Sequence, residues 1–237
     1  MKQIMILLLV TGTALALPGS LSGQVGHPPE SSPYRPIRAR KTLFFTGGRF
    51  AGSEGKVGVG PTDGTFLGVK FGYHPGGPVE FLLGLGSMSL DRTIIDPTQG
   101  AANRAVGSVS QTVRLWDIGV VLRLTGRKSW HRLAPYVGGT FGIANASDVA
   151  DTVSGFGFKT QFHYGPQAGF LWILSDKTSL RFEARDVLWR LKYPLVFFQS
   201  PANAPNEPPL LNQNLDRRTQ WVHHALLTIS FGYALGF

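Results

Sequence analysis

Cysteine is absent from the 237-residue chain. Its absence excludes disulfides, thiolate nucleophiles and cysteine-based metal sites. Charged residues are also scarce, at 16% of the chain, against the roughly 25% of a typical soluble domain. Beyond residue 20, no apolar run approaches the ~20 residues that a membrane-spanning helix needs. The sequence therefore excludes a bundle of membrane helices, and its 11% of aromatic residues argues against a disordered chain.

The first 23 residues are typical of a secretory signal peptide. Lys2 precedes an apolar stretch over residues 4–10, and small residues follow it as far as Gly23. This apolar stretch is too short to anchor a chain in a bilayer. We therefore expect residues 1–23 to direct export and to be removed, with cleavage after Ala16 and cleavage near Gly23 both fitting the pattern.

Residues 24–41 are rich in proline and arginine, with cations at Arg35, Arg38, Arg40 and Lys41. Four prolines and the lack of an apolar period predict a periplasmic tether rather than a core element. A basic cluster is also typical of nucleic-acid binding. Because an exported chain rarely meets nucleic acid, we expect no such partner and interpret the cluster as solvated charge beside an anionic membrane surface.

From residue 42 onward, apolar and polar residues alternate. In residues 64–74, for example, Leu67, Val69 and Phe71 lie on one face and glycine, lysine and histidine on the other. Alternation with period two predicts β-strands. Eight stretches show it: 42–51, 64–74, 79–88, 114–124, 133–143, 158–174, 180–185 and 221–237.

One face of these predicted strands is apolar and aromatic, and the other carries glycine, serine, threonine, glutamine and a few charges. A soluble sheet buries its apolar face and places lysine and glutamate on the wet one. Small and charged residues instead fit a narrow interior, which leaves the apolar face to meet lipid. We therefore predict an all-β fold over residues 42–237, an eight-stranded antiparallel up-and-down transmembrane β-barrel.

The connections support this topology, because long and short joins alternate along the chain. Long loops outside the cell and tight turns in the periplasm are expected of strands that cross the outer membrane, with both termini periplasmic. The long joins are 52–63, 91–112, 145–157 and 193–219, and the short joins are 75–78, 126–131 and 175–178.

Aromatic residues are predicted to form two belts at headgroup depth. The predicted strand directions put Trp116, Trp189 and Trp221 in the outer belt. They put Tyr73 and Trp172 in the periplasmic belt.

The end of the sequence resembles the terminal recognition strand of outer-membrane proteins, which the barrel-assembly machinery reads. Apolar and aromatic residues occupy every second position there: Ile229, Phe231, Tyr233, Leu235 and Phe237. The resemblance implies that these five residues form an assembly signal.

Three segments carry a wider resemblance: APYVGGTFG at 134–142, GPQAGFLWILSDKTSLRFEARD at 165–186 and LLTISFGYALGF at 226–237. Over roughly residues 40–237 the chain resembles small eight-stranded barrels of the OmpA/OmpX type, in the bacterial outer membrane protein beta-barrel domain family. The resemblance implies a monomer in the cell outer membrane, with no cofactor. Its implied partners are outer-membrane lipids and lipopolysaccharide, with periplasmic chaperones and the barrel-assembly machinery during biogenesis. One departure is that Asp186 and Arg190 fall on the lipid face, so either a bulge shifts the alternation or the strand has risen into the outer interface.

Seven charged residues are predicted to point into the barrel. An eight-stranded barrel is just wide enough for side chains to fill, and buried charge is tolerated only when it is paired. We interpret these residues as a salt-bridge plug in a barrel with a structural or surface-interaction role, and keep a narrow channel for ions or small hydrophobic solutes as the alternative. The residues are Lys70, Glu80, Asp117, Arg123, Arg181, Glu183 and Arg185.

A lipid-acyl-modifying enzyme is the second alternative, but the sequence lacks a convincing nucleophile and base. His163 falls on the lumen face, and His223 and His224 fall on opposite faces of one strand. His223 could meet a serine or aspartate from the loop 193–219, but nothing in the spacing demands it. We expect no catalytic residue, and no metal-binding motif is present.

The loop 193–219 combines five prolines with the apolar run Leu195 to Phe198. We favour a continuation of the strands above the membrane with a proline-rigid tip over an exposed adhesion site. Arg217 and Arg218, where the loop returns, are placed to meet lipopolysaccharide phosphates.

Overall fold

The computed structural model describes residues 31–147, 149, 151 and 153–236, and the fold belongs to the compact unit that begins at Pro33. The expected signal peptide 1–23, residues 24–30 of the expected tether, and Phe237 lie outside the described residues. Within the described ranges, no helix has the length and apolar character needed to cross a bilayer.

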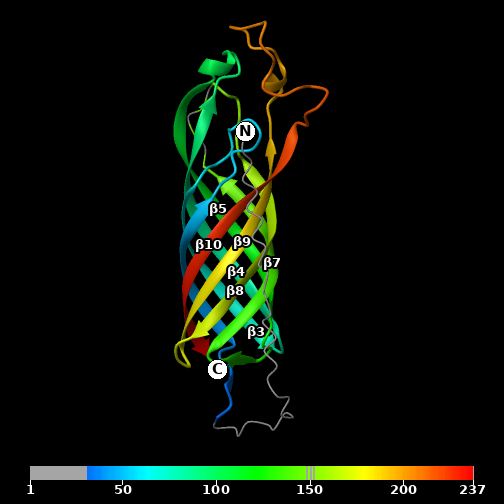
Figure 1. The fold of residues 1–237 in the computed structure, drawn as a ribbon. Coiled ribbons are helices and arrows are strands. Elements are labelled where there is room, and N and C mark those ends of the chain that lie inside the picture. The colour runs from blue at the N-terminus through cyan, green and yellow to red at the C-terminus, as the bar shows by residue number, and fades with distance from the viewer. Residues whose placement is uncertain (1–30, 148, 150, 152, 237) are drawn as a thin grey trace, which may run out of the picture. The chain divides into compact units, whose positions relative to one another are not determined.

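Eight long strands close into a barrel (Figure 1). Each pairs antiparallel with the next along the chain, and the last strand pairs with the first from Ala51–Ala225 to Lys41–Gly236. The predicted eight-stranded up-and-down barrel is therefore confirmed. Its strands are β2 (Lys41–Ala51), β3 (Gly64–Gly76), β4 (Val79–Ile95), β5 (Ala105–Arg123), β7 (Leu133–Ala146), β8 (Thr160–Ile173), β9 (Thr178–Lys192) and β10 (Thr219–Gly236).

The two ends of the barrel differ in their connections, as the sequence predicts. At the short-turn end, Gly76 and Gly77 have positive φ angles of 129° and 74° and join β3 to β4. At the long-loop end lie the joins after β2, β4, β7 and β9. The hairpin β4–β5 extends further than predicted, because its pairing continues to Ile95–Ala105 and leaves a loop of only nine residues, 96–104.

The outer wall changes polarity along the barrel axis. Toward the short-turn end, the outward side chains are apolar and exposed, for example Trp116, Val120 and Phe231. Toward the long-loop end, the same outward phase carries polar residues, such as Ser89 on β4 and Arg114 on β5. We call the apolar outward residues the apolar band.

The interior changes polarity at the same level but in the opposite sense. The half near the long-loop end holds an apolar cluster, which includes Phe50, Phe66, Met88 and Trp189. The predicted inward face of small and charged residues is therefore wrong for this half. Inward and outward positions still alternate along each strand in this half. Here the polar residues occupy the outward positions and the apolar residues the inward ones, as in a soluble protein.

The loop 193–218 folds onto this apolar cluster. It forms the short helix η2 (Leu195–Phe198), in which Phe197 and Phe198 are buried, while Leu195 stays exposed. The expected strand continuation is wrong, because β9 ends at Lys192. The alternative of an exposed apolar surface is also wrong for the two phenylalanines, because burial against the cluster stabilises them more than exposure would.

The segment 33–40 lies across the short-turn end rather than trailing from it as a tether. Its strand β1 (Tyr34–Pro36) pairs with β6 (Lys128–Trp130), which is part of the connection from β5 to β7. The chain then enters β2 on the far side of the ring. Ile37 packs against Phe44, Ala134 and Leu171 of the barrel interior. We call residues 33–40 the strap. The tether interpretation fails here because Ile37 finds apolar contacts that the local sequence pattern does not reveal.

Candidate functional site

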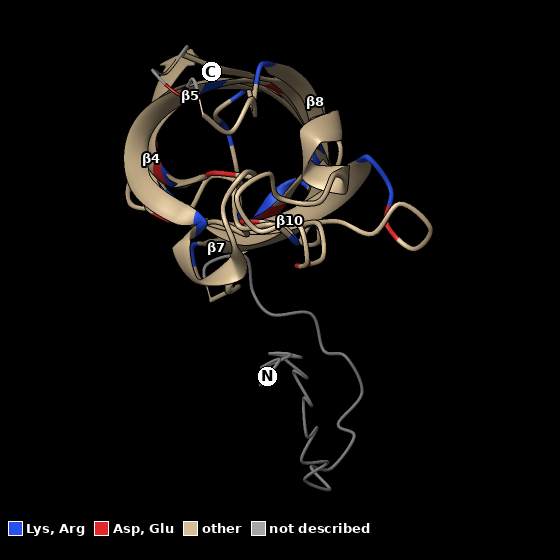
Figure 2. Ribbon diagram, turned by 90° about the horizontal axis from the view of Figure 1, so that it is seen from above, with Lys and Arg blue, Asp and Glu red and all other residues tan. Residues whose placement is uncertain are grey.

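The structure places all seven predicted lumen charges inside the barrel, each no more than 7% exposed. They come from β3, β4, β5 and β9, because the alternation puts each one in the inward phase. Figure 2, which looks down on the ring from above, shows charged positions on several of its strands.

Glu80 and Glu183 anchor the larger of two ion-pair groups. Glu80 accepts from Arg181 (Oε1–Nη1 3.3 Å) and lies 3.1 Å from Nη2 of Arg123. Glu183 pairs with Lys70 (Oε1–Nζ 2.5 Å) and lies 3.6 Å from Nε of Arg181. Arg181 therefore joins both carboxylates into one chain of charges.

Tyr136 links the centre of this group. Arg181 Nε donates to the Tyr136 hydroxyl at 2.9 Å, and the hydroxyl donates to Glu183 Oε2 at 3.0 Å. The Arg181 guanidinium also lies 4.3 Å from the centroid of the Tyr136 ring and 5.2 Å from that of Phe44. Hydrogen bonds and ring contacts together hold Arg181 in one orientation.

Asp117 anchors the second group. It accepts from Arg185 Nη1 at 2.8 Å, and its other oxygen lies 3.0 Å from His163 Nε2. Arg185 Nη1 also lies 3.4 Å from the Thr140 hydroxyl. Tyr136 and His163 were not among the predicted network residues, although both stand in the inward phase, which is the signal that could have found them.

Several interior polar atoms have no protein partner within the described part of the chain. They include Nε and Nη2 of Arg185 and both amide atoms of Gln167, which pair in register on β9 and β8. Buried polar atoms of this kind are normally satisfied by ordered water. The polar half of the interior therefore keeps hydrogen-bonding capacity beyond that used by its protein partners.

The apolar cluster closes this network toward the long-loop end. Trp189 is fully buried there, with its ring 5.5 Å from Phe50, 5.0 Å from Phe158 and 4.3 Å from His224. Its predicted place in the outer belt is therefore wrong. Pairing along β9 runs without a bulge, so Trp189 keeps the inward phase of Arg185 four residues before it.

The same unbroken phase decides the position of Asp186 and Arg190. Both face outward and no bulge shifts the strand, and the exposed Trp221, which pairs with Arg190, lies further toward the long loops than Asp186. The carboxylate of Asp186 lies 2.7 Å from Nδ1 of His223. The partner of His223 is therefore a residue of β9 and not a serine or aspartate of the loop 193–219.

The other expected belt residues and the described part of the assembly signal face outward. Among the residues of the apolar band, Trp116 and Trp221 lie on the side nearer the long loops, and Tyr73 and Trp172 on the side nearer the short turns. The exposed residues of β10 are Ile229, Phe231, Tyr233 and Leu235.

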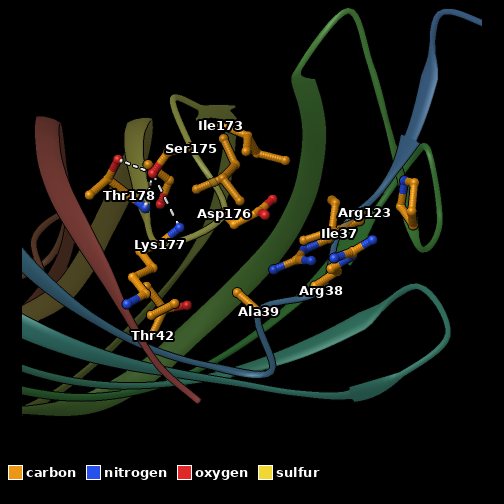
Figure 3. Close-up of a pocket in the computed structure, with 14 residues that line it drawn as sticks. Ile37, Arg38, Ala39, Thr42, Arg123, Ile173, Ser175, Asp176, Lys177 and Thr178 are labelled. Carbon is orange, nitrogen blue, oxygen red and sulfur yellow. Dashed lines mark hydrogen bonds between the residues drawn. The ribbon is translucent and has the colours of Figure 1, made fainter. Parts of the chain in front are cut away.

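The strap closes the network toward the short-turn end (Figure 3). A cavity of about 40 Å³ at this end is lined by Ile37 and Arg38 of the strap and by Arg123 of the charge network. The barrel interior therefore has two closures, one apolar at the long-loop end and one made by the strap.

Comparison with known proteins gives fold-level likeness only. No family model and no curated protein matches the chain. Among solved structures, the neisserial surface protein NspA is 11% identical, with a TM-score of 0.49 over 86% of this chain and 98% of its own. The outer membrane protein OprG of Pseudomonas aeruginosa is 13% identical, with a TM-score of 0.45 over 82% and 95%. The N-terminal β-barrel domain of OprF from the same organism is also 13% identical, with a TM-score of 0.41 over 82% and 98%. Because all three scores lie below 0.5, we infer nothing about activity or partners from them.

Proposed function

We propose that this protein is a small β-barrel of the bacterial outer membrane, with a structural or surface-interaction role and a lumen filled by side chains. The reversal of polarity along the outer wall carries the proposal. From Trp116 on β5 to Leu124, just past the end of that strand, the apolar outward face is roughly 27 Å long at ~3.4 Å per residue. A strand tilt of about 40° reduces this to roughly 21 Å along the axis, close to the ~25 Å apolar band of outer-membrane barrels.

The interior supports a plug rather than an open pore. Glu80 and Glu183 each have two cationic neighbours, and Asp117 has Arg185 with His163 beside it. The strap and the apolar cluster stand at the two ends of the network. Such a barrel offers its rim and loops to other molecules, and Arg217 and Arg218 are exposed where they could meet lipopolysaccharide phosphates. We assign the barrel no chemistry of its own, and release of acyl chains from lipopolysaccharide by the purified protein would overturn that assignment.

Two arginine substitutions test the membrane placement. Val120 faces outward near the middle of the apolar band, and Ser89 faces outward beyond it. Val120→Arg should lower the stability of the barrel folded in lipid vesicles by about 2–4 kcal/mol, and Ser89→Arg by about 0–1 kcal/mol. Equal effects of the two substitutions in a urea titration would contradict the placement.

A narrow channel for ions or small hydrophobic solutes is the second candidate. The interior polar atoms that lack a protein partner, on Arg185 and Gln167, favour water in the polar half. Planar-bilayer recordings discriminate the two functions. We expect no current steps, because both closures are in place, and discrete conductance steps would favour the channel.

A further inference from the structure

A groove of about 300 Å³ opens beside the strap at the short-turn end. It lies between the strap, the β6–β7 turn and the β8–β9 turn. Its charged residues are Arg35 and Arg38 of the strap, Arg132 and Asp176, and the hydroxyls of Ser129 and Ser175 also line it. None of these residues belongs to the interior charge network.

The groove is suited to an anion. Arg38 and Arg132 line it together with a single carboxylate, that of Asp176. Guanidinium groups bind phosphate oxygens through paired N–H donors, and they do so better than a lysine ammonium. The surrounding rim adds Arg127, Lys128 and Lys177, so the local potential favours a ligand with net negative charge.

The turn that carries Arg132 is held in an unusual conformation. His131 and Arg132 have φ angles of 47° and 69°, a left-handed region that non-glycine residues rarely occupy in succession. Three hydrogen bonds fix the turn. His131 N donates to Pro33 O at 3.0 Å, Ile173 N to Arg132 O at 2.8 Å, and Arg132 Nη1 to Leu174 O at 3.3 Å. The strap and β8 therefore hold the turn at the groove.

An apolar ledge borders the groove on the outer wall. Leu133 pairs in register with both Trp130 and Trp172, and these two rings are 49% and 43% exposed. The ledge continues the apolar band toward the short-turn end. An acyl chain lying on this wall would bring its headgroup to the level of the groove.

We propose that this groove binds the phosphate headgroup of an anionic phospholipid in the membrane leaflet at the short-turn end. The proposal rests on the membrane placement proposed above. Arg38 and Arg132 contact the phosphate oxygens. Asp176 accepts hydrogen bonds from headgroup hydroxyls, which suits a glycerol headgroup.

Lipid titration of the full chain in neutral detergent micelles, read by native mass spectrometry, tests the site. The probes are phosphatidylglycerol and phosphatidylcholine with identical acyl chains. We expect phosphatidylglycerol to bind at least tenfold more tightly. The double variant Arg38→Gln with Arg132→Gln should lose at least tenfold of that affinity. The matched control is Arg127→Gln with Lys128→Gln, which removes the same charge from the same rim outside the groove and should stay within twofold of the parent.

Each other outcome overturns the site. Equal losses in the two double variants would show a nonspecific charge effect, and equal binding of the two lipids would show no headgroup recognition. Displacement of phosphatidylglycerol by millimolar inorganic phosphate would assign the groove to free phosphate instead. Because Arg132→Gln could unfold the turn, Arg38→Gln alone serves as a second variant, with an expected loss of about threefold, the square root of the tenfold loss of the pair. A chain that does not fold in micelles, as judged by heat-dependent gel migration, contradicts the proposed function, whereas a folded barrel without lipid preference contradicts only this inference.

Discussion

Neutralising Glu183 tests whether paired charge holds the barrel interior together. Glu183 is buried among Lys70, Arg181 and Tyr136, with its Oε1 2.5 Å from the Lys70 ammonium. The interior holds four cations and three carboxylates of the predicted network. Glu183→Gln leaves Lys70 without its carboxylate and raises the excess of buried positive charge from one to two.

The expected loss of stability is large, because an unpaired buried ion cannot recover its hydration. Breaking a buried ion pair by removing one partner costs about 3–5 kcal/mol. With a urea dependence of about 2 kcal/mol per molar, the unfolding midpoint should fall by roughly 1.5–2.5 M. Tryptophan fluorescence during urea titration in detergent micelles measures this shift. The exposed Glu54 provides the control, since Glu54→Gln should change stability by no more than ~0.5 kcal/mol.

A second substitution separates electrostatics from packing. Lys70→Met in the Glu183→Gln background removes the stranded ammonium and returns the excess charge to one. Most of the lost stability should therefore return, as a positive coupling energy in the double-mutant cycle. An unchanged midpoint for Glu183→Gln, or no recovery with Lys70→Met, would refute the plug as an electrostatic structure.

Two further predictions concern the long-loop end. Trp189→Ala should lower the free energy of unfolding by about 3–5 kcal/mol, because it empties a packed interior site. A variant that keeps Trp189 as its sole tryptophan should retain its fluorescence in vesicles of brominated lipid. Strong quenching would contradict the inward position. Burial tends to raise the pKa of Asp151, but hydrogen bonds from Ser154 and Arg92 outweigh it and leave the pKa below its ordinary value. A depressed pKa means that this carboxylate stabilises the fold above the unfolded-state pKa of about 3.9. The stabilisation is lost as the pH falls through the lower folded-state pKa, so the protection factors of amides in residues 153–159 should fall below about pH 4 and recover on neutralisation. Protection factors that do not change with pH would contradict this role of Asp151.

Strand positions and faces were largely predictable from the sequence, because alternation is a local property of the chain. The stretch 64–74 became β3 (Gly64–Gly76), and Lys70 kept the inward phase that alternation assigned to it. The partners of Lys70 were not predictable. They depend on the stagger between strands that are distant along the chain, which no local pattern records.

The errors have identifiable physical causes. The height of Trp189 on its strand predicts a place in the outer belt, but counting by twos from Arg185 gives the inward position that the structure has. An outward face of apolar residues predicts that β4 ends at residue 88, whereas the strand continues to Ile95 with polar residues outward and apolar residues inward. The strap was missed because the pairing of Tyr34 with Trp130 joins segments nearly a hundred residues apart.

The opposite polarities of the two barrel halves mean that no single solvent suits the whole chain. A detergent belt should cover only the half near the short turns and leave the other half bare to water. Antibodies and neighbouring molecules in a crystal could then contact a rigid, detergent-free column of strands, which is the outer wall of the barrel half near the long loops. A micelle chosen to be thin would preserve that column, whereas an excess of long-chain detergent would compete for the phenylalanines that seal its interior.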